Sequence, residues 1–138
     1  ELGVDLALSH HDEERPGKIV EATGGRGAEV IVEMLANVNL ERDMGMAAHG
    51  GRIVVVGSRG SIEVTPRQLM GREADVRGLT LYSATADEQR EIHAAIGAGL
   101  ASGALRPVIQ KTLPLAEAPE AHRAVIEDTS RGKIILKP

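Results

Sequence analysis

The sequence contains no cysteine, no phenylalanine, no tryptophan and a single tyrosine. Without cysteine, disulfides, thiolate catalysis and cysteine-ligated zinc are excluded for these residues. The scarcity of aromatic rings argues against a nucleic-acid-binding protein that stacks bases on aromatic side chains. No apolar stretch approaches the ~18 residues of a membrane-spanning helix. What remains is a globular chain with a core of Val, Ile, Leu, Met and Ala.

Length and charge narrow the function classes further. The 138 residues fit one domain, and 42% of them are hydrophobic, which is enough for a core. The net charge is −4, so binding to nucleic acid by phosphate neutralisation is not expected. The lack of cysteine agrees with a reducing compartment, and we expect a cytoplasmic protein. The sequence does not begin with Met, and we expect it to be part of a longer chain.

Apolar runs that alternate with helical spacing predict an α/β fold. Strands are predicted at residues 6–9, 29–35, 52–56, 76–82 and 133–136, with an extended segment at 107–115. Helices are predicted at residues 13–22, 40–48, 65–70, 86–101 and 116–127. Because strands alternate with helices, we expect a parallel sheet with helical crossovers and central strands buried on both faces.

The ends of one helix are predicted from its flanking residues. Asn39 is expected to cap the helix that starts at residue 40, with Asp43 in its first turn. The run HGG at residues 49–51 is expected to end this helix.

In parallel α/β sheets, ligands bind beyond the carboxyl ends of the strands. This rule selects the loops at residues 10–11, 36–39, 57–60 and 82–85. In the third of these loops, Gly57 lets a backbone approach a ligand closely, Ser58 offers a hydroxyl and Arg59 offers a charged fork suited to phosphate. The same residues also fit a simple glycine-bracketed turn. His10 could flank a ring such as adenine, or it could be an ordinary loop histidine.

The sequence offers no complete phosphate-binding, metal or catalytic motif. The glycines at residues 24–27 do not have the spacing of the dinucleotide fingerprint, and they precede a strand instead of following one. The five histidines form no recognised ligand spacing. Glu33 has no obvious partner, and Asp87 is interpreted as part of a capping sequence with Thr85. The catalytic residues stay unknown, although direct hydride transfer from a cofactor needs no base.

Five stretches of the sequence resemble one family. They are EMLANVNL, HGGRIVVVGSRG, GLTLYSAT, LRPVIQKTLPLAEAPEAH and GKIILKP. Together they resemble the zeta-crystallin-type quinone oxidoreductases of the medium-chain dehydrogenase/reductase superfamily, in order and over nearly the whole chain. These proteins have a GroES-like catalytic domain and a Rossmann domain that binds NADPH.

The resemblance implies an incomplete Rossmann-like parallel sheet with helices on both faces. Residues 1–105 would be the C-terminal part of the NAD(P)-binding domain, and residues 106–138 would be the tail that rejoins the absent catalytic domain. The resemblance also implies a zinc-independent protein and a homodimer formed through the edge strand at residues 76–81.

The cofactor contacts are also carried over from the resemblance, position by position. His10 would lie beside the adenosine end of NADP(H), Asn39 would contact the cofactor, and the backbone of residues 80–82 would meet the nicotinamide amide. The implied cofactor-binding residues are His10, Asn39, Val56, Gly57, Ser58, Arg59, Thr80, Leu81 and Tyr82.

These expectations describe the longer chain of which this sequence would be a part, the parent protein, as an NADPH-dependent quinone oxidoreductase. It would transfer a hydride from nicotinamide to a quinone or a related electron-poor acceptor, and the isolated chain would be inactive. Two alternatives stay open: a non-catalytic fragment or oligomerising module, and an enoyl or enone reductase of the same superfamily. The expected partner is a small quinone-like substrate, with neither nucleic acid nor a membrane involved.

Overall fold

The computed structural model describes residues 3–127 and 132–138. The chain forms two compact units, Glu1–Ser83 and Ala84–Pro138. Each unit is described by itself below. The division predicted after residue 105, between the NAD(P)-binding part and the tail that rejoins the catalytic domain, is a different boundary. It stays a prediction.

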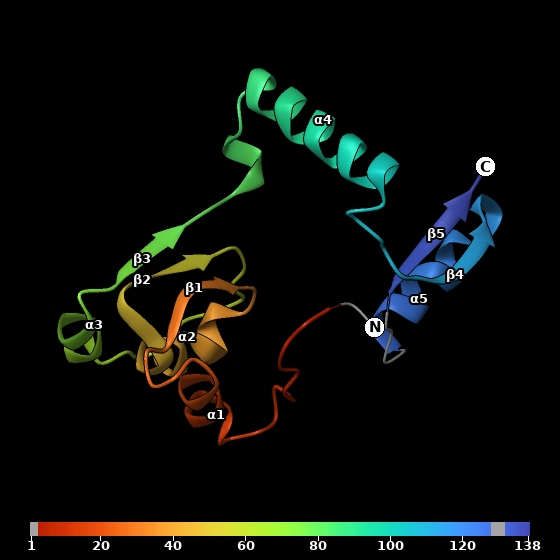
Figure 1. Cartoon of the computed structure of the whole chain (residues 1–138). Helices are drawn as coiled ribbons and strands as arrows, with labels where there is room; N and C mark the ends of the chain where they lie inside the picture. Colours follow the sequence, from red (N-terminus) through yellow and green to blue (C-terminus); the bar gives the residue numbers. More distant parts are fainter. Residues whose placement is uncertain (1–2, 128–131) are drawn as a thin grey trace. The chain divides into compact units, whose positions relative to one another are not determined.

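The first unit is a three-stranded parallel sheet with helical crossovers (Figure 1). Its strands are β1, β2 and β3, and β2 lies in the centre. Both strand pairs are parallel, as the alternation of strands and helices predicted. In chain order the elements are α1 (Arg15–Ala22), β1 (Ala28–Glu33), α2 (Ala36–Met46), β2 (Ala47–Val55), α3 (Pro66–Arg72), β3 (Asp75–Gly78) and a short 3-10 helix, Leu81–Ser83.

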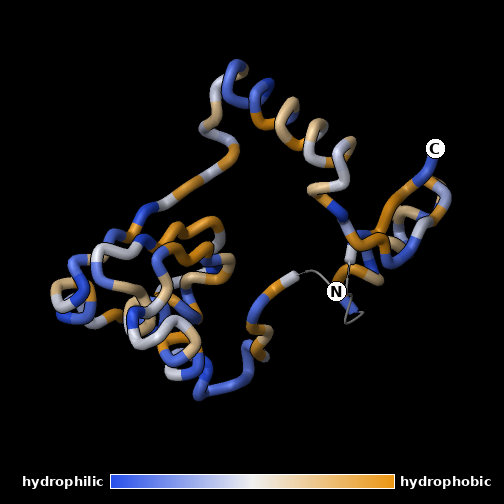
Figure 2. The backbone as a smooth tube through the Cα atoms, viewed as in Figure 1, coloured by the Kyte–Doolittle hydropathy of each residue, from blue (hydrophilic) through white to orange (hydrophobic). Residues whose placement is uncertain are grey.

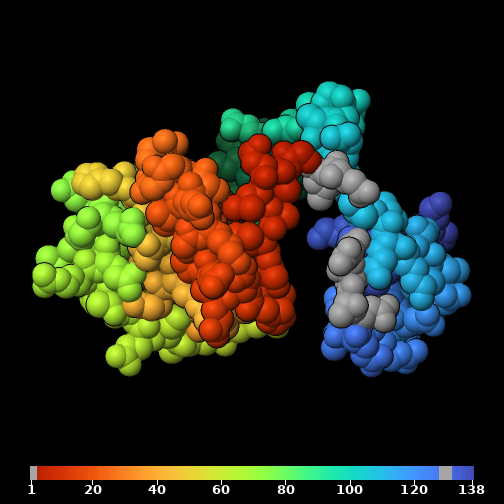
Figure 3. Space-filling view, turned by 60° about the horizontal axis from the view of Figure 1, so that its bottom comes forward, coloured from red at the N-terminus to blue at the C-terminus, as the bar shows by residue number. Residues whose placement is uncertain are grey.

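The core of this unit lies between one face of the sheet and its helices. Met44 of α2 and Ile53 of β2 are almost completely buried. Ile31 is the neighbour of Ile53 across the strand pair, so both side chains point to this face. Leu40 and Leu69 pack against the same cluster from α2 and α3. In Figure 3, α1 (red-orange) lies directly beside α2 residues (yellow-orange), which extends the helical layer.

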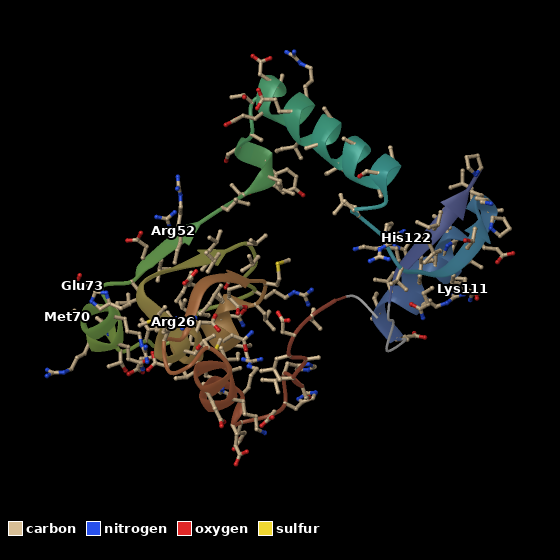
Figure 4. All side chains as sticks on the ribbon, viewed as in Figure 1. Arg26, Arg52, Met70, Glu73, Lys111 and His122 are labelled. Carbon is tan, nitrogen blue, oxygen red and sulfur yellow. The ribbon has the colours of Figure 1, made fainter. Side chains whose placement is uncertain are left out.

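The opposite face of the sheet is open in this unit. Val30 and Val32 alternate with the core residues of β1, and they are 64% and 63% exposed. Arg52, labelled in Figure 4, lies beside Val30 and pairs with Asp75 of β3 at 3.1 Å. Figure 2 shows β1 and β2 as largely hydrophobic strands. The described helices of the first unit therefore cover one face, whereas the prediction placed helices on both.

Residues 6–9 do not form the predicted strand. They lie outside the three-stranded sheet, in which β1 is an edge strand. An apolar run becomes a strand only where a neighbouring strand satisfies its backbone groups, and in the described part of the chain these residues have none.

The predicted cap and end of α2 are wrong. The helix begins at Ala36 with Leu35 as its N-cap, so Asn39 lies inside it. It ends at Met46, and β2 starts at the next residue. His49 and its two following glycines therefore belong to the strand. The guanidinium of Arg72 donates hydrogen bonds to the carbonyls of Gly45 and Ala47, which stabilises this abrupt junction.

The predicted strand at residues 76–82 ends early, at Gly78. Its partner β2 ends at Val55, opposite Gly78. The Leu79 N–H makes one further hydrogen bond, to the Val55 carbonyl at 2.9 Å. Beyond Leu79 the described residues provide no strand for pairing, and the chain turns into the 3-10 helix.

The second unit contains a long helix and a two-stranded parallel sheet. Its elements are α4 (Ala86–Ser102), β4 (Ile109–Pro114), a 3-10 helix (Leu115–Glu117), α5 (Ala118–Glu127) and β5 (Lys133–Lys137). Ala121 and Ala124 of α5 are buried. Lys111 of β4, labelled in Figure 4, pairs with Glu120 of α5 at 2.8 Å.

A full capping box opens α4. The Glu88 N–H donates to the Thr85 hydroxyl, and the Thr85 N–H donates to the Glu88 carboxylate at 2.7 Å. The partner of Thr85 is therefore Glu88, and not Asp87 as predicted. Asp87 instead pairs with Arg90 one turn later.

None of the helices in residues 3–127 and 132–138 is both long and apolar enough to cross a membrane.

Candidate functional site

The carboxyl ends of the three strands in the first unit lie together. The Val56 N–H donates to the Glu33 carbonyl at 2.8 Å, which joins the end of β2 to that of β1. The Ala36 N–H donates to the Gly57 carbonyl at 2.9 Å, which joins the start of α2 to the loop after β2. This is the edge at which the strand-end rule predicts a ligand site.

A groove lies at this edge, between the ends of β2 and β3. It has a volume of about 360 Å³ and is mostly apolar. Its lining residues are Val55, Val56, Gly57, Ser58, Gly78, Leu79 and Thr80. Ligand pockets range from about 300 to 1,000 Å³, so the groove could hold part of a ligand of cofactor size.

Gly57 is required by a contact within the chain. A Cβ at this position would lie 2.3 Å from the Met34 carbonyl oxygen and 3.1 Å from its carbon. A side chain at this position would therefore overlap backbone atoms of Met34. The backbone that approaches Gly57 is that of Met34, and contact of Gly57 with a ligand stays a prediction.

Asn37 holds the loop that carries Ser58 and Arg59. Its Oδ1 accepts a hydrogen bond from the Arg59 N–H at 2.8 Å and lies 3.5 Å from the Ser58 hydroxyl. The Ser58 hydroxyl also donates to the Gly60 carbonyl at 3.1 Å. The sequence analysis missed Asn37, because its place in the first turn of α2 is visible only once the helix is known to start at Ala36.

Arg59 is exposed, and it follows Ser58, which lines the groove. Within the described residues, no hydrogen bond or ion pair involves its guanidinium. Its backbone is fixed while its charge stays available, which suits recognition of an anionic group.

Two carboxyl groups are buried at the end of β1. Glu33 is 6% exposed and Asp43 is 1% exposed. Glu33 Oε1 accepts hydrogen bonds from the Leu35 N–H and, at 3.1 Å, from the Asn39 side-chain amide. The Asp43 carboxyl can share a proton with Glu33 in a hydrogen bond, whereas Asp43 Oδ2 is buried and has no hydrogen-bond partner among the described residues. The expectation that Glu33 lacks a partner is wrong, because helix α2 starts early enough to place two side chains against it.

The two carboxyl groups have opposite pKa shifts. Burial raises the pKa of Asp43 to about 7, and the hydrogen bond and negative charge of Glu33 add to the rise. Burial also raises the pKa of Glu33, but the hydrogen bonds from Asp43, Asn39 and Leu35 outweigh it, and its pKa lies below the usual value. Because the two pKa shifts are opposite, the first proton that the pair takes up sits on Asp43 and not on Glu33.

Only some of the other predicted site residues line the groove. Val56 and Thr80 line the groove. Leu81 and Tyr82 lie in the 3-10 helix and are 65% and 99% exposed. His10 lies in a turn before α1, with its ring centroid 3.8 Å from that of His11, and it is not among the groove residues. The structure thus does not bring His10 to the groove.

Comparison with known proteins identifies the family. The sequence model of the family described as zinc-binding dehydrogenase matches residues 2–136. The chain belongs to this family. The quinone oxidoreductase of Homo sapiens is 42% identical to it over 135 residues, which cover 97% of this chain and 41% of that protein. The resemblance to quinone oxidoreductases of the medium-chain dehydrogenase/reductase superfamily is thereby confirmed, and the chain spans less than half of the length of this relative.

Solved structures confirm the fold of this family member. An NAD-dependent alcohol dehydrogenase is 28% identical, has a TM-score of 0.82, and is matched over 99% of this chain and 38% of its own. A mycobacterial protein complexed with NADPH has a TM-score of 0.81 over 99% of this chain and 44% of its own. At 22% identity, this second likeness shows the fold alone. The chain therefore has the fold of the C-terminal part of a dinucleotide-binding domain.

The zinc in the family's description does not fit the described residues. The sequence has no cysteine, and in residues 3–127 and 132–138 no three His, Asp or Glu side chains are grouped to hold a metal ion. We therefore derive no step through zinc, and zinc independence of the whole protein stays a prediction.

Proposed function

We propose that this chain forms part of the NADP(H)-binding domain of a quinone oxidoreductase. The parent protein would transfer a hydride from nicotinamide to a quinone or a related electron-poor acceptor. The observation that carries the proposal is the groove at the carboxyl edge of the parallel sheet, with the exposed Arg59 next in sequence to Ser58, which lines it. The 42% identity to human quinone oxidoreductase supports this choice of reaction.

The chemistry of the groove fits a dinucleotide. Val55, Val56 and Leu79 give it apolar walls against which a flat ring can pack, and Ser58 and Thr80 add hydroxyl groups. Arg59 would bind a phosphate of the cofactor. Asn39 would make a hydrogen bond to the cofactor. Bound NADPH would supply the hydride.

The chain's own residues would hold the cofactor and keep water from its reacting face. Residues 80–82 would orient the nicotinamide, and they lie where the chain leaves the sheet beyond β3. His10 is proposed for the adenosine end, on the resemblance alone. No residue of this chain is assigned as catalytic.

Replacement of Arg59 tests the cofactor site. In the full-length protein, Arg59→Ala should raise the KM for NADPH by roughly tenfold, as expected for one charge-assisted hydrogen bond of about 1.5 kcal/mol. Arg26→Ala is the matched control, because Arg26 is also exposed but lies in the loop before β1, at the amino edge of the sheet. Steady-state kinetics with a quinone acceptor measures both variants, and an unchanged KM for Arg59→Ala removes Arg59 from the site.

The same assay separates the alternatives. Reduction of an enone or enoyl thioester, without reduction of quinones, would favour the other reductase class of the superfamily. Failure to bind or oxidise NADPH would favour a non-catalytic module.

The remaining assignments concern assembly and location. We propose a homodimer formed through residues 76–81, because β3 is an edge strand of the described sheet and Val76 is 41% exposed. Light scattering on the full-length protein tests this, and a monomer at all concentrations would contradict it. A cytoplasmic location stays a proposal, and cell fractionation tests it.

A further inference from the structure

The amide of Asn39 is held in one orientation. Its Nδ2 donates to Glu33 Oε1 at 3.1 Å. An ionised carboxylate only accepts hydrogen bonds, so the NH₂ side of the amide must face Glu33. The carbonyl oxygen Oδ1 of Asn39 is then the group left for another partner.

Glu33 is itself fixed from several elements. The Leu35 N–H at the end of β1 donates to the same Oε1. Asp43 follows Asn39 by one helical turn on α2, so both side chains reach Glu33 from the same face of that helix. Arg15 of α1 is the charged group that faces the pair from the third element, and its positive charge acts on both carboxyl groups. Glu33 is thus a rigid acceptor at the carboxyl edge of the sheet.

We propose that Glu33 is a positioning residue, which fixes the amide of Asn39 so that Asn39 offers its Oδ1 acceptor, and not its NH₂ group, to the cofactor. The matching group on the dinucleotide is a hydrogen-bond donor, a ribose hydroxyl or the carboxamide N–H. This inference rests on the proposed NADP(H) site and deepens it.

Asp43 makes this arrangement depend on pH. Below neutral pH its carboxyl carries the proton that it donates to Glu33, and the carboxylate of Glu33 holds Asn39. As the pH rises through about 7, Asp43 loses that proton, and two buried negative charges then face each other. The Asp43 pKa is raised in the folded state, so the stability that its proton contributes is lost as the pH rises toward this value. The affinity for the cofactor should fall as the pH rises through about 7, where Asp43 of the folded protein loses its proton.

A double-mutant cycle in the full-length protein tests the proposal. NADPH affinity is measured by fluorescence titration at pH 6 for wild type, Glu33→Gln, Asn39→Ala and the double variant. Each single change should weaken binding by roughly three- to tenfold, the worth of one hydrogen bond. The double variant should bind no more weakly than Asn39→Ala alone, because Glu33 acts through Asn39. Glu29→Gln, the same change at an exposed position of β1, should bind as wild type does.

Asp43→Asn provides a second arm that does not depend on Glu33→Gln folding. The Asn amide can donate to Glu33 at every pH, so this variant should bind NADPH as wild type does at pH 6 and more tightly than wild type at pH 8. Comparing the two proteins cancels the titration of the cofactor's own phosphates.

The outcomes distinguish a failure of the proposed NADP(H) function from a failure of the positioning role of Glu33. If the wild type does not bind NADPH, the proposed function fails, and this inference fails with it. If the wild type binds but Glu33→Gln is unchanged, or its effect adds fully to that of Asn39→Ala, the inference alone is overturned. Identical pH profiles for wild type and Asp43→Asn would also overturn it.

Discussion

At the scale of single residues, the sequence analysis found the loop of the site but not what holds it. Gly57, Ser58 and Arg59 were selected because a buried strand runs into them. The supporting contacts come from the Asn37 side chain and the Glu33 backbone carbonyl, which lie on other elements. Which side chains of α2 face β1 and the loop after β2 depends on the residue at which the helix starts. An error of one residue in that start therefore changes every one of these contacts.

A test at this scale compares two glycines of one loop. Gly57→Ala should lower the free energy of unfolding by more than about 1 kcal/mol, because the new methyl group would overlap the Met34 carbonyl. Gly60→Ala is the control, since its Cβ would meet only the Asn37 side chain, at 3.7 Å and beyond. Urea unfolding of the full-length protein measures both, and equal stability of the two variants would contradict the overlap.

At the scale of elements, helices with local signals were predicted best. Thr65 and Pro66 marked the start of α3, and the capping sequence marked that of α4, whereas α1 begins at Arg15 and not at the predicted residue 13. The errors fell where a boundary depends on a distant partner. Residues 6–9 have no strand beside them among the described residues, β3 ends where β2 ends, and α2 starts where Gly57 accepts its first N–H.

Two threonine caps allow a matched test of local stabilisation. Thr85 makes a full capping box with Glu88, whereas Thr65 caps α3 without a side-chain hydrogen bond. Thr85→Ala should therefore cost about 1 kcal/mol of unfolding free energy, and Thr65→Ala only a few tenths. Thermal unfolding of the two variants gives the comparison. An equal loss in both would show that the box contributes nothing.

At the scale of the whole molecule, the family could be predicted from the sequence and the site only in part. The resemblance to quinone oxidoreductases is confirmed, but it does not determine which contacts each position makes. His10 illustrates this limit, since its turn before α1 lies apart from the groove residues. The open face of the first unit's sheet marks a further limit, because periodicity cannot say which element covers an apolar surface.

The chain lacks the glycine fingerprint for the pyrophosphate, and this leads to a prediction for the isolated 138 residues. NADPH should bind them weakly or not at all, whereas the full-length protein should bind it, because a dinucleotide needs both halves of its site. Parallel titrations, with circular dichroism to confirm folding, measure the difference. Micromolar binding by the isolated chain would contradict the expectation.

The two halves of β2 have different consequences for how the chain length can vary. The pairing of β2 with β1 is irregular between Ala47 and Arg52 and regular from Arg52 to Val55. One extra alanine between Arg52 and Ile53 would shift the regular pairing by one position and turn Ile53 from the core toward the open face. An alanine inserted after Gly24, in the turn before β1, should be absorbed by that turn. Soluble expression of the two insertion variants should therefore differ sharply, and natural length variation should concentrate in the turn and avoid the regular part of β2.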